Sequence, residues 1–209
     1  RKANDGDVIK KGQSFIEFEG PASILLKGER TALNFLQHMS GIATKTREFC
    51  NKVAGLPVKV TDTRKTVPGI RHLAKYAVRA AGGSNHRQCL SDGVLIKDNH
   101  IYAAGGIANA IEQVRGNIPH TIKIEVETEN LDQVREALDS KADIIMLDNM
   151  SIEMMKEAVA LINKRALVEA SGNVNLDNIY EIACTGVDII SVGALTHSVK
   201  AADISMRFV

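Results

Sequence analysis

The sequence predicts a parallel α/β fold, and two observations support this prediction. After Pro57, six short apolar runs alternate with amphipathic stretches of helical periodicity. The runs span residues 58–60, 93–96, 122–126, 144–147, 167–170 and 189–192, and the helical stretches between them span 71–81, 107–115, 131–138, 152–163 and 176–184. This alternation is typical of parallel strands joined by right-handed helical crossovers. The second observation is that every run is followed by polar residues or glycine, as expected where parallel strands end at a functional edge.

The chain before Pro57 has a different character. Residues 4–7 and 10–12 have turn chemistry, and residues 14–18 alternate like a half-buried strand, so residues 1–28 are predicted to form short strands and turns. Residues 29–56 have helical periodicity, and Ser40-Gly41 predicts a break within that stretch. The predicted organisation is therefore a strand-rich segment 1–28, a helical connection 29–56 and an α/β unit 57–209.

Composition excludes several classes of protein. The 209 residues are 44% hydrophobic and 24% charged with a formal net charge of +1, which fits a globular protein and argues against a general nucleic-acid binder. The sequence contains no uncharged apolar run long enough to predict a membrane helix. Three scattered cysteines, Cys50, Cys89 and Cys184, predict reduced, buried thiols of a cytoplasmic protein. Because the chain opens with Arg1 in mid-pattern, we expect that the start of the protein lies outside this sequence.

The residues that follow the runs carry the predicted chemistry. Basic residues gather there although the net charge is near zero, and arginine and lysine bind carboxylates and phosphates. Glu127 and Asp148 supply the oxygen ligands that Mg²⁺ prefers when it is held largely through substrate phosphates. Glycine-containing loops at 171–173 and 192–194 allow backbone N–H groups to approach a phosphate. The set predicts a phosphorylated sugar beside a small carboxylated molecule. The basic residues are Arg64, Lys65, His86, Arg87 and Lys97.

Several alternatives are excluded or stay open. The sequence contains no P-loop, GxGxxG, GxSxG or HExxH motif. The strand before Asp148 ends in one acid followed by Asn149, whereas the PRPP-binding strand of type I phosphoribosyltransferases ends in two acids. The sequence therefore does not match that type. For His197 a loop-holding hydrogen bond and a ligand contact are equally compatible with the sequence.

An ordered series of motifs resembles the quinolinate phosphoribosyltransferase family over nearly the whole chain. Each motif alone is weak, but the ordered series is specific. The motifs are GERTALNF at 28–35, SGIAT at 40–44, TRKTVPG at 63–69, NHR at 85–87, GVLIKDNH at 93–100, IEVE at 124–127, MLDN at 146–149, EASGN at 169–173 and SVGALTHS at 191–198.

The resemblance implies a fold and a reaction. The fold is an irregular α/β barrel of about six parallel strands, with residues 1–28 as the remnant of an N-terminal open-faced β-sandwich domain. The reaction is decarboxylating phosphoribosyl transfer from 5-phosphoribosyl 1-pyrophosphate (PRPP) to quinolinate. It gives nicotinate mononucleotide, pyrophosphate and CO2 with Mg²⁺ in NAD biosynthesis.

The resemblance also implies roles for individual residues. Lys65, Lys97, Glu127 and Asp148 would be catalytic, and the last two would be the metal ligands. Arg30 would reach the active site of the neighbouring subunit in a homodimer or higher homo-oligomer. Quinolinate would be bound by Arg30, Thr63, Arg64, Lys65, His86, Arg87 and Lys97. PRPP and its phosphates would be bound by Lys65, Lys97, Glu127, Asp148, Ser171, Gly172, Asn173, Val192, Gly193, Ala194 and His197.

Two other functions stay open at this point. A related enzyme acting on another pyridine carboxylate, such as nicotinate, or a homologue from molybdate-transport operons, would share many motifs. A catalytically inactive paralogue that binds a ligand would also share them, although the intact set of acids and bases argues against decay. We expect small-molecule substrates, no nucleic acid and no membrane partner.

Overall fold

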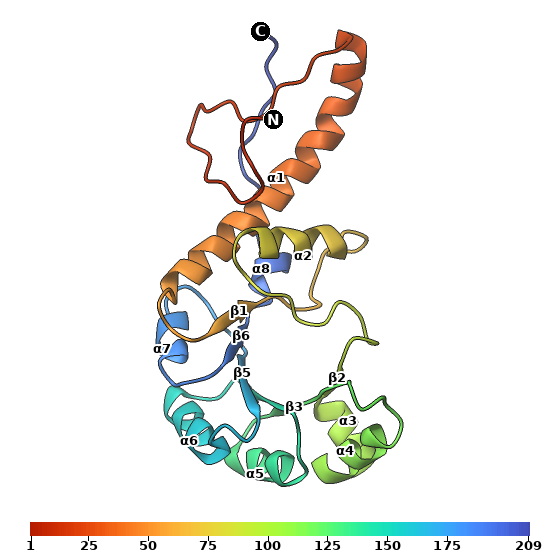
Figure 1. Cartoon of the computed structure of the whole chain (residues 1–209), viewed down its shortest axis with the longest axis vertical. Helices are drawn as coiled ribbons and strands as arrows, with labels where there is room; N and C mark the ends of the chain where they lie inside the picture. The colour runs from red at the N-terminus through yellow and green to blue at the C-terminus, as the bar shows by residue number, and fades with distance from the viewer.

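A computed structural model describes all residues from Arg1 to Val209 and contains one six-stranded sheet in which every strand pair is parallel (Figure 1). The order in the sheet is β1-β6-β5-β4-β3-β2. The predicted parallel α/β fold and its six strands are therefore confirmed. The strands are β1 (Lys59–Thr61), β2 (Val94–Ile96), β3 (Ile124–Thr128), β4 (Ile144–Asp148), β5 (Leu167–Ser171) and β6 (Ile189–Ser191).

This strand order is that of a barrel opened between β1 and β2. β1 pairs with the last strand, β6, while β1 and β2 are not hydrogen-bonded to each other. Residues after helix α2 occupy the free side of β1: Ser84 forms a parallel bridge with Thr61, and its N–H donates to the carbonyl of Val60 at 2.8 Å. The segment 84–87 therefore partly fills the opening.

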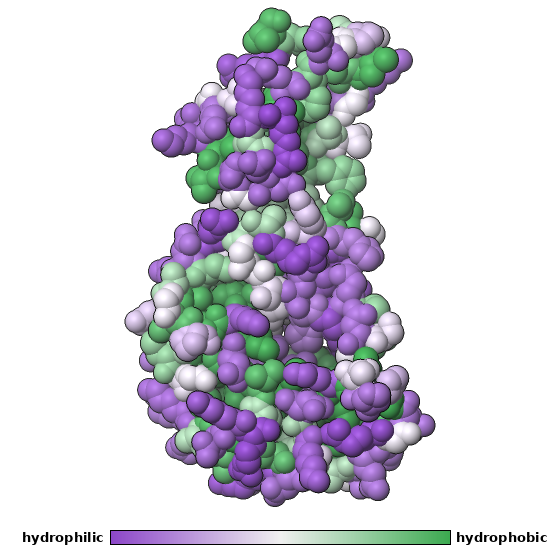
Figure 2. Space-filling model, in the orientation of Figure 1, coloured by the Kyte–Doolittle hydropathy of each residue, from purple (hydrophilic) through white to green (hydrophobic).

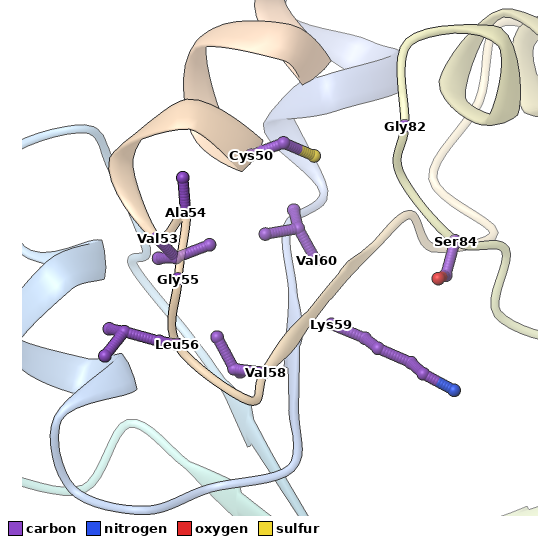
Figure 3. A pocket seen from close by; sticks show the side chains of 10 residues that line it. All are labelled: Cys50, Val53, Ala54, Gly55, Leu56, Val58, Lys59, Val60, Gly82 and Ser84. Carbon is purple, nitrogen blue, oxygen red and sulfur yellow. The ribbon is translucent and has the colours of Figure 1, made fainter.

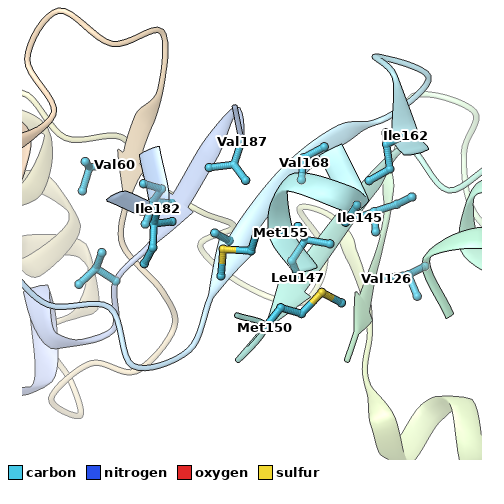
Figure 4. Close-up of a cluster of buried hydrophobic side chains, with 14 of the residues drawn as sticks. Val60, Val126, Ile145, Leu147, Met150, Met155, Ile162, Val168, Ile182 and Val187 are labelled. Atoms are coloured by element: carbon cyan, nitrogen blue, oxygen red, sulfur yellow. The ribbon is translucent and has the colours of Figure 1, made fainter. Parts of the chain in front are cut away.

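The two faces of the sheet differ in polarity because strand side chains alternate with a period of two. On β3, Ile124 and Val126 belong to the hydrophobic core, whereas Glu125 and Glu127, which alternate with them, do not. Figure 4 shows Val126, Ile145, Leu147 and Val168 from neighbouring strands beside Met155 and Ile162 of helix α6. The helix-covered face is therefore apolar, and the opposite face, which forms the inside of the curved sheet, carries the acids.

Eight helices accompany the sheet. The predicted stretches of α2, α4, α5 and α6 are confirmed within one residue at each end, whereas α7 is shorter than predicted, and α3 was not predicted as a helix. Asn130 and Ser151 cap α5 and α6 by accepting hydrogen bonds from the backbone N–H groups of Gln133 and Met154. The helices are α1 (Ala22–Lys52), α2 (Arg71–Ala80), α3 (Asp98–Ala104), α4 (Ile107–Arg115), α5 (Leu131–Asp139), α6 (Ile152–Ile162), α7 (Ile179–Ala183) and α8 (Ala194–His197).

The predicted break at Ser40-Gly41 is wrong, because α1 continues through both residues. Gly41 serves a close approach instead: a Cβ on this glycine would lie 2.3 Å from the carbonyl oxygen of Lys200. Gln37 holds the same C-terminal segment through its Nε2, which donates to the carbonyl of Ile204 at 2.7 Å. The segment after α8 therefore runs against the middle of α1, and both chain ends lie beside the half of α1 that extends away from the sheet (Figure 1).

The predicted strand at 14–18 is also wrong, because residues 1–21 contain no helix or strand. Alternation alone does not make a strand without a hydrogen-bonding partner, and here only the N–H of Lys2 donates to the carbonyl of Phe15. The turns at 4–7 and 10–13 are confirmed by i to i+3 backbone hydrogen bonds. The helical connection begins at Ala22 rather than at residue 29. The assignment of 1–28 to a sandwich remnant stays a prediction.

Two smaller predictions concern thiols and membranes. All three cysteines are free, as predicted, but Cys184 is exposed rather than buried, and the other two are half-buried. No helix combines the length and the apolar character that crossing a bilayer requires.

Candidate active site at the carboxyl ends of the strands

Four predicted site residues meet at the carboxyl ends of neighbouring strands, and we call them the rim: Lys97, Glu127, Asp148 and Ser171. Lys97 follows β2, and its Nζ lies 2.5 Å from Oε2 of Glu127 at the end of β3. Asp148 and Ser171 are register partners at the ends of β4 and β5. The structure therefore brings together, at one end of the polar interior, residues that lie far apart in the sequence.

The loop after β5 is tied to the acid at the end of β4. Gly172 has a φ of +93°, and a Cβ there would come 2.2 Å from Oδ1 of Asn149. Asn173 Nδ2 donates to the same oxygen at 2.9 Å, and Asn149 Nδ2 donates to Asp148 Oδ2 at 2.7 Å. Only glycine fits this position, and the predicted phosphate loop 171–173 lies directly beside Asp148.

A second group of predicted residues gathers after β1 and β6. A Cβ on Gly193 would lie 3.2 Å from Cδ of Lys65 and 3.1 Å from Nε2 of His197. Thr196 Oγ1 donates to the carbonyl of Lys65 at 2.6 Å, and Thr63 Oγ1 accepts from the N–H of Lys65 at 3.0 Å. Lys65 therefore lies on an anchored loop, and its side chain passes beside Gly193.

Two arginines of the predicted carboxylate pocket lie close together. Burial lowers the pKa of Arg87, and the positive charge of Arg64 lowers it further, while Glu125 opposes both effects. Arg64 Nε is buried without a hydrogen-bond partner. Arg71 fixes the loop around them by donating to the carbonyl of Arg64 and to Oγ1 of Thr66. Two adjacent guanidinium groups with an unused donor form a site for an anion.

Deeper in the interior lies a group that we call the inner cluster: His86, Glu125 and Glu169. His86 Nε2 is 3.1 Å from Glu125 Oε2 and 3.7 Å from Glu169 Oε1. Burial lowers the pKa of His86, but the hydrogen bond to Glu125 and the two negative charges outweigh it and raise that pKa above its ordinary value. Burial, followed by the charge of Glu125, raises the pKa of Glu169 to about 7.

A buried ion pair beneath the basic loop was missed in the sequence. Asp62, fully buried after β1, accepts hydrogen bonds from Lys75 Nζ at 2.5 Å, Asn85 Nδ2 at 2.5 Å and the N–H of His86 at 2.9 Å. Lys75 also donates to the carbonyl of His86 at 2.9 Å. The available signal was a lysine on the same helical face as Ala74 and Val78, because such a lysine requires a buried acid.

Arg30 is the one predicted site residue that lies away from the others. It is exposed on the half of α1 that extends away from the sheet, and its side chain makes no hydrogen bond or ion pair. A cavity at the amino end of β1 is likewise remote from the rim. It measures about 220 Å³ and lies between the end of α1 and the start of β1, where Cys50, Val53 and Lys59 are among its lining residues (Figure 3). None of the predicted site residues lines it.

Comparison with known proteins gives a consistent result. The family model described as quinolinate phosphoribosyl transferase, C-terminal domain, matches residues 42–207, and the model of the N-terminal domain matches residues 1–40. The probable nicotinate-nucleotide pyrophosphorylase (carboxylating) of Bacillus subtilis is 48% identical over 202 residues, which are 97% of this chain and 70% of that protein. The mitochondrial quinolinate phosphoribosyltransferase (decarboxylating) 2b of Nicotiana tabacum is 48% identical, over 98% of this chain and 63% of that protein. The crystal structure of NadC from Streptococcus pyogenes matches with a TM-score of 0.95 at 45% identity and covers 99% of this chain and 73% of that one.

Proposed function

Because the chain belongs to the quinolinate phosphoribosyltransferase family, we propose that it transfers the phosphoribosyl group of PRPP to quinolinate. The products are nicotinate mononucleotide, pyrophosphate and CO2, and the reaction belongs to de novo NAD biosynthesis. The observation that carries the proposal is that Arg64, which follows the carboxyl end of β1, is close enough to Arg87 to lower its pKa, while Glu127 and Asp148 lie at the carboxyl ends of β3 and β4 of the same parallel sheet. A site with both features can bind a dianionic pyridine beside a phosphorylated sugar.

The quinolinate carboxylates would bind to the basic group. Arg64 and Arg87 offer forked donors, and Lys65 and Lys97 add point charges at the edge of the same space. Thr63 and His86 would support these contacts. A cationic pocket offsets the repulsion between two anionic substrates and holds the pyridine nitrogen near the anomeric carbon of the ribose.

The phosphoribosyl group would lie over the acids of the rim. Glu127 and Asp148 would hold the ribose hydroxyls, and their charges would favour the cationic ribose that develops as pyrophosphate departs. In the structure Glu127 is paired with Lys97, so substrate binding would exchange this contact for contacts to the sugar and its phosphates. The 5-phosphate would be bound by Ser171, Gly172, Asn173, Val192, Gly193, Ala194 and His197.

Glu127 and Asp148 also fit a Mg²⁺ ion held mainly through pyrophosphate and water. Both are oxygen donors on neighbouring strands, and the only hydrogen bond to the Asp148 carboxylate comes from Asn149 Nδ2. A bound Mg²⁺ would neutralise charge on the leaving pyrophosphate.

CO2 would be lost after the ring nitrogen has been ribosylated. The positive ring nitrogen stabilises the electron pair that the departing CO2 leaves on the ring carbon, and a proton from water then bonds to that carbon; no organic cofactor motif occurs in the sequence. The residues around the ring need only hold it in place while the bond to CO2 breaks.

We further propose a homodimer in which Arg30 completes the partner's site. Arg30 lies on a part of α1 that carries exposed apolar residues, including Ile24, Leu26 and Phe35. Figure 2 shows hydrophobic residues at that end of the molecule. Apolar surface of this kind is typical of a protein interface. A cytoplasmic location stays a prediction.

The assay that tests the function supplies PRPP and Mg²⁺ with either quinolinate or nicotinate. We expect CO2 and nicotinate mononucleotide to form from quinolinate, with no turnover of nicotinate. Turnover of nicotinate alone would assign the chain to the related pyridine-carboxylate enzymes. Tight binding of quinolinate without turnover would indicate an inactive ligand-binding paralogue.

A further inference from the structure

His86 is held from two sides by buried acids, one that follows β1 and one on β3. On one side Asp62, after β1, accepts the backbone N–H of His86 at 2.9 Å. On the other side Oε2 of Glu125, on β3, lies 3.1 Å from the imidazole Nε2. Since β1 and β2 are not paired, His86 lies on the segment that occupies the opening of the barrel. These contacts tie that segment to both sides of the opening.

The hydrogen bonds of His86 define where its ring proton lies. The backbone N–H of Arg87 donates to Nδ1 of His86 at 2.8 Å, so Nδ1 is an acceptor. In a neutral imidazole the remaining hydrogen is then on Nε2, which donates it to Glu125. If Nδ1 were protonated, its hydrogen would face the N–H of Arg87, which is also a donor. This geometry therefore requires the neutral ring, although Glu125 and Glu169 raise the pKa of His86.

The same bonds exclude the inner cluster as a metal centre. Its three ligand atoms lie within 4.8 Å of one another, close enough to surround an ion. A metal bound to Nε2 would leave the ring hydrogen on Nδ1, where it would face the N–H of Arg87. The cluster is therefore a hydrogen-bonded group that orients His86.

We propose that Glu125 is a positioning residue for quinolinate binding, acting through the His86 imidazole on the backbone N–H of Arg87. Glu125 fixes the tautomer and orientation of the ring, and Nδ1 of the ring fixes the backbone N–H of Arg87. The far end of the side chain is fixed where Arg87 Nη1 donates to the carbonyl of Gly93 at 2.9 Å. With both ends fixed, the guanidinium stays beside Arg64 in the anion site. This inference rests on the proposed function.

Glu169 provides a matched comparison within the same cluster. It is as deeply buried as Glu125, with exposed fractions of 2% and 4%, respectively. Its nearest oxygen is 3.7 Å from His86 Nε2, too far for a hydrogen bond. Replacing Glu169 therefore changes the charge and volume of the cluster but leaves the bond from His86 to Glu125 intact.

The experiment compares Glu125→Leu and Glu125→Gln with Glu169→Leu and Glu169→Gln. The glutamine oxygen at position 125 can still accept the Nε2 hydrogen, whereas leucine cannot. We expect Glu125→Leu to weaken quinolinate binding by calorimetry at least roughly tenfold, because hydrogen bonds to charged groups have this magnitude. Glu125→Gln and both Glu169 variants should stay near wild type, and PRPP binding should stay unchanged in all four.

A second measurement works without any substrate. Nitrogen NMR of the histidine rings should show the Nε2–H tautomer of His86 in the wild type and in Glu125→Gln, and a mixture of tautomers in Glu125→Leu. An unchanged tautomer in a folded Glu125→Leu protein would overturn the inference. So would equal losses of quinolinate affinity in the position 125 and 169 leucine variants. If instead the wild type does not bind quinolinate while the tautomer responds as expected, the proposed function fails and the orienting role of Glu125 survives. If Glu125→Leu does not fold, Glu125→Gln alone tests the inference. Its glutamine oxygen still accepts the hydrogen bond, so loss of quinolinate binding in this variant would contradict a role carried by that bond.

Discussion

Glu169 is expected to make the protein less stable as the pH rises. The carboxyl group is 2% exposed, and burial together with the charge of Glu125 raises its pKa from 4.5 to about 7. In the unfolded chain the group ionises near its ordinary pKa, so the folded state binds more protons between these two values. Stability supplied by the protonated group is therefore present below pH 4.5 and is lost as the pH rises toward 7.

Glu169→Gln removes this ionisation while keeping the shape of the neutral side chain. The interval between 4.5 and about 7 corresponds to a free energy of about 3 kcal/mol. About a quarter of this difference is already present at pH 5. We therefore expect the difference in the free energy of unfolding, Glu169→Gln minus wild type, to be about 2–3 kcal/mol larger at pH 8 than at pH 5.

The assay is urea unfolding followed by circular dichroism at several pH values from 5 to 8. Glu112→Gln, at an exposed position of α4, serves as the control and should follow the wild type at every pH. A stability gap between Glu169→Gln and wild type that does not change with pH would refute the reasoning, because the gap must come from ionisation.

Three further predictions concern the site. Lys97→Ala should reduce kcat/KM by an amount that corresponds to at least ~2–3 kcal/mol of transition-state stabilisation, with an unchanged melting temperature, and near-normal kinetics would remove Lys97 from the site. Glu127→Gln and Asp148→Asn should weaken Mg²⁺-dependent binding of PRPP more than binding of quinolinate in calorimetric titrations, and equal effects would contradict their assignment. Arg30→Ala and Lys97→Ala proteins should each be nearly inactive, but a mixture under subunit exchange should regain about a quarter of wild-type activity, since half the dimers would have one intact site of two. No recovery in proven heterodimers would place Arg30 outside the partner's site.

The sheet and the rim could be predicted because their signals are local. Each strand is a short apolar run, and polar residues follow it wherever a strand reaches the carboxyl end of the sheet. The pattern alone therefore predicts Lys97, Glu127 and Asp148 as site residues. The parallel arrangement alone requires that residues at corresponding strand ends lie near one another.

The errors arise where a residue serves a partner far away in the sequence. Gly41 resembles a helix breaker, yet α1 continues through it. Glycine is needed at this position because the backbone of Lys200 passes too close for any side chain. Lys75 lies on the apolar face of α2, but the sequence does not show that Asp62 is the acid that pairs with it and leaves it 1% exposed. Neither partner lies within the window that a periodicity argument uses, so tertiary contact overrides the local signal.

Strand β3 shows how one local pattern supplies both parts of the site. With a period of two, Ile124 and Val126 point into the apolar core, and Glu125 and Glu127 point to the polar interior at successive depths. The deeper acid contacts His86, and the outer acid contacts Lys97. A slip of one residue would move both carboxylates into the core and both aliphatic side chains into the site, and two unpaired buried charges cost several kcal/mol each. The register that positions Glu125 and Glu127 is therefore the one that the hydrophobic core itself requires.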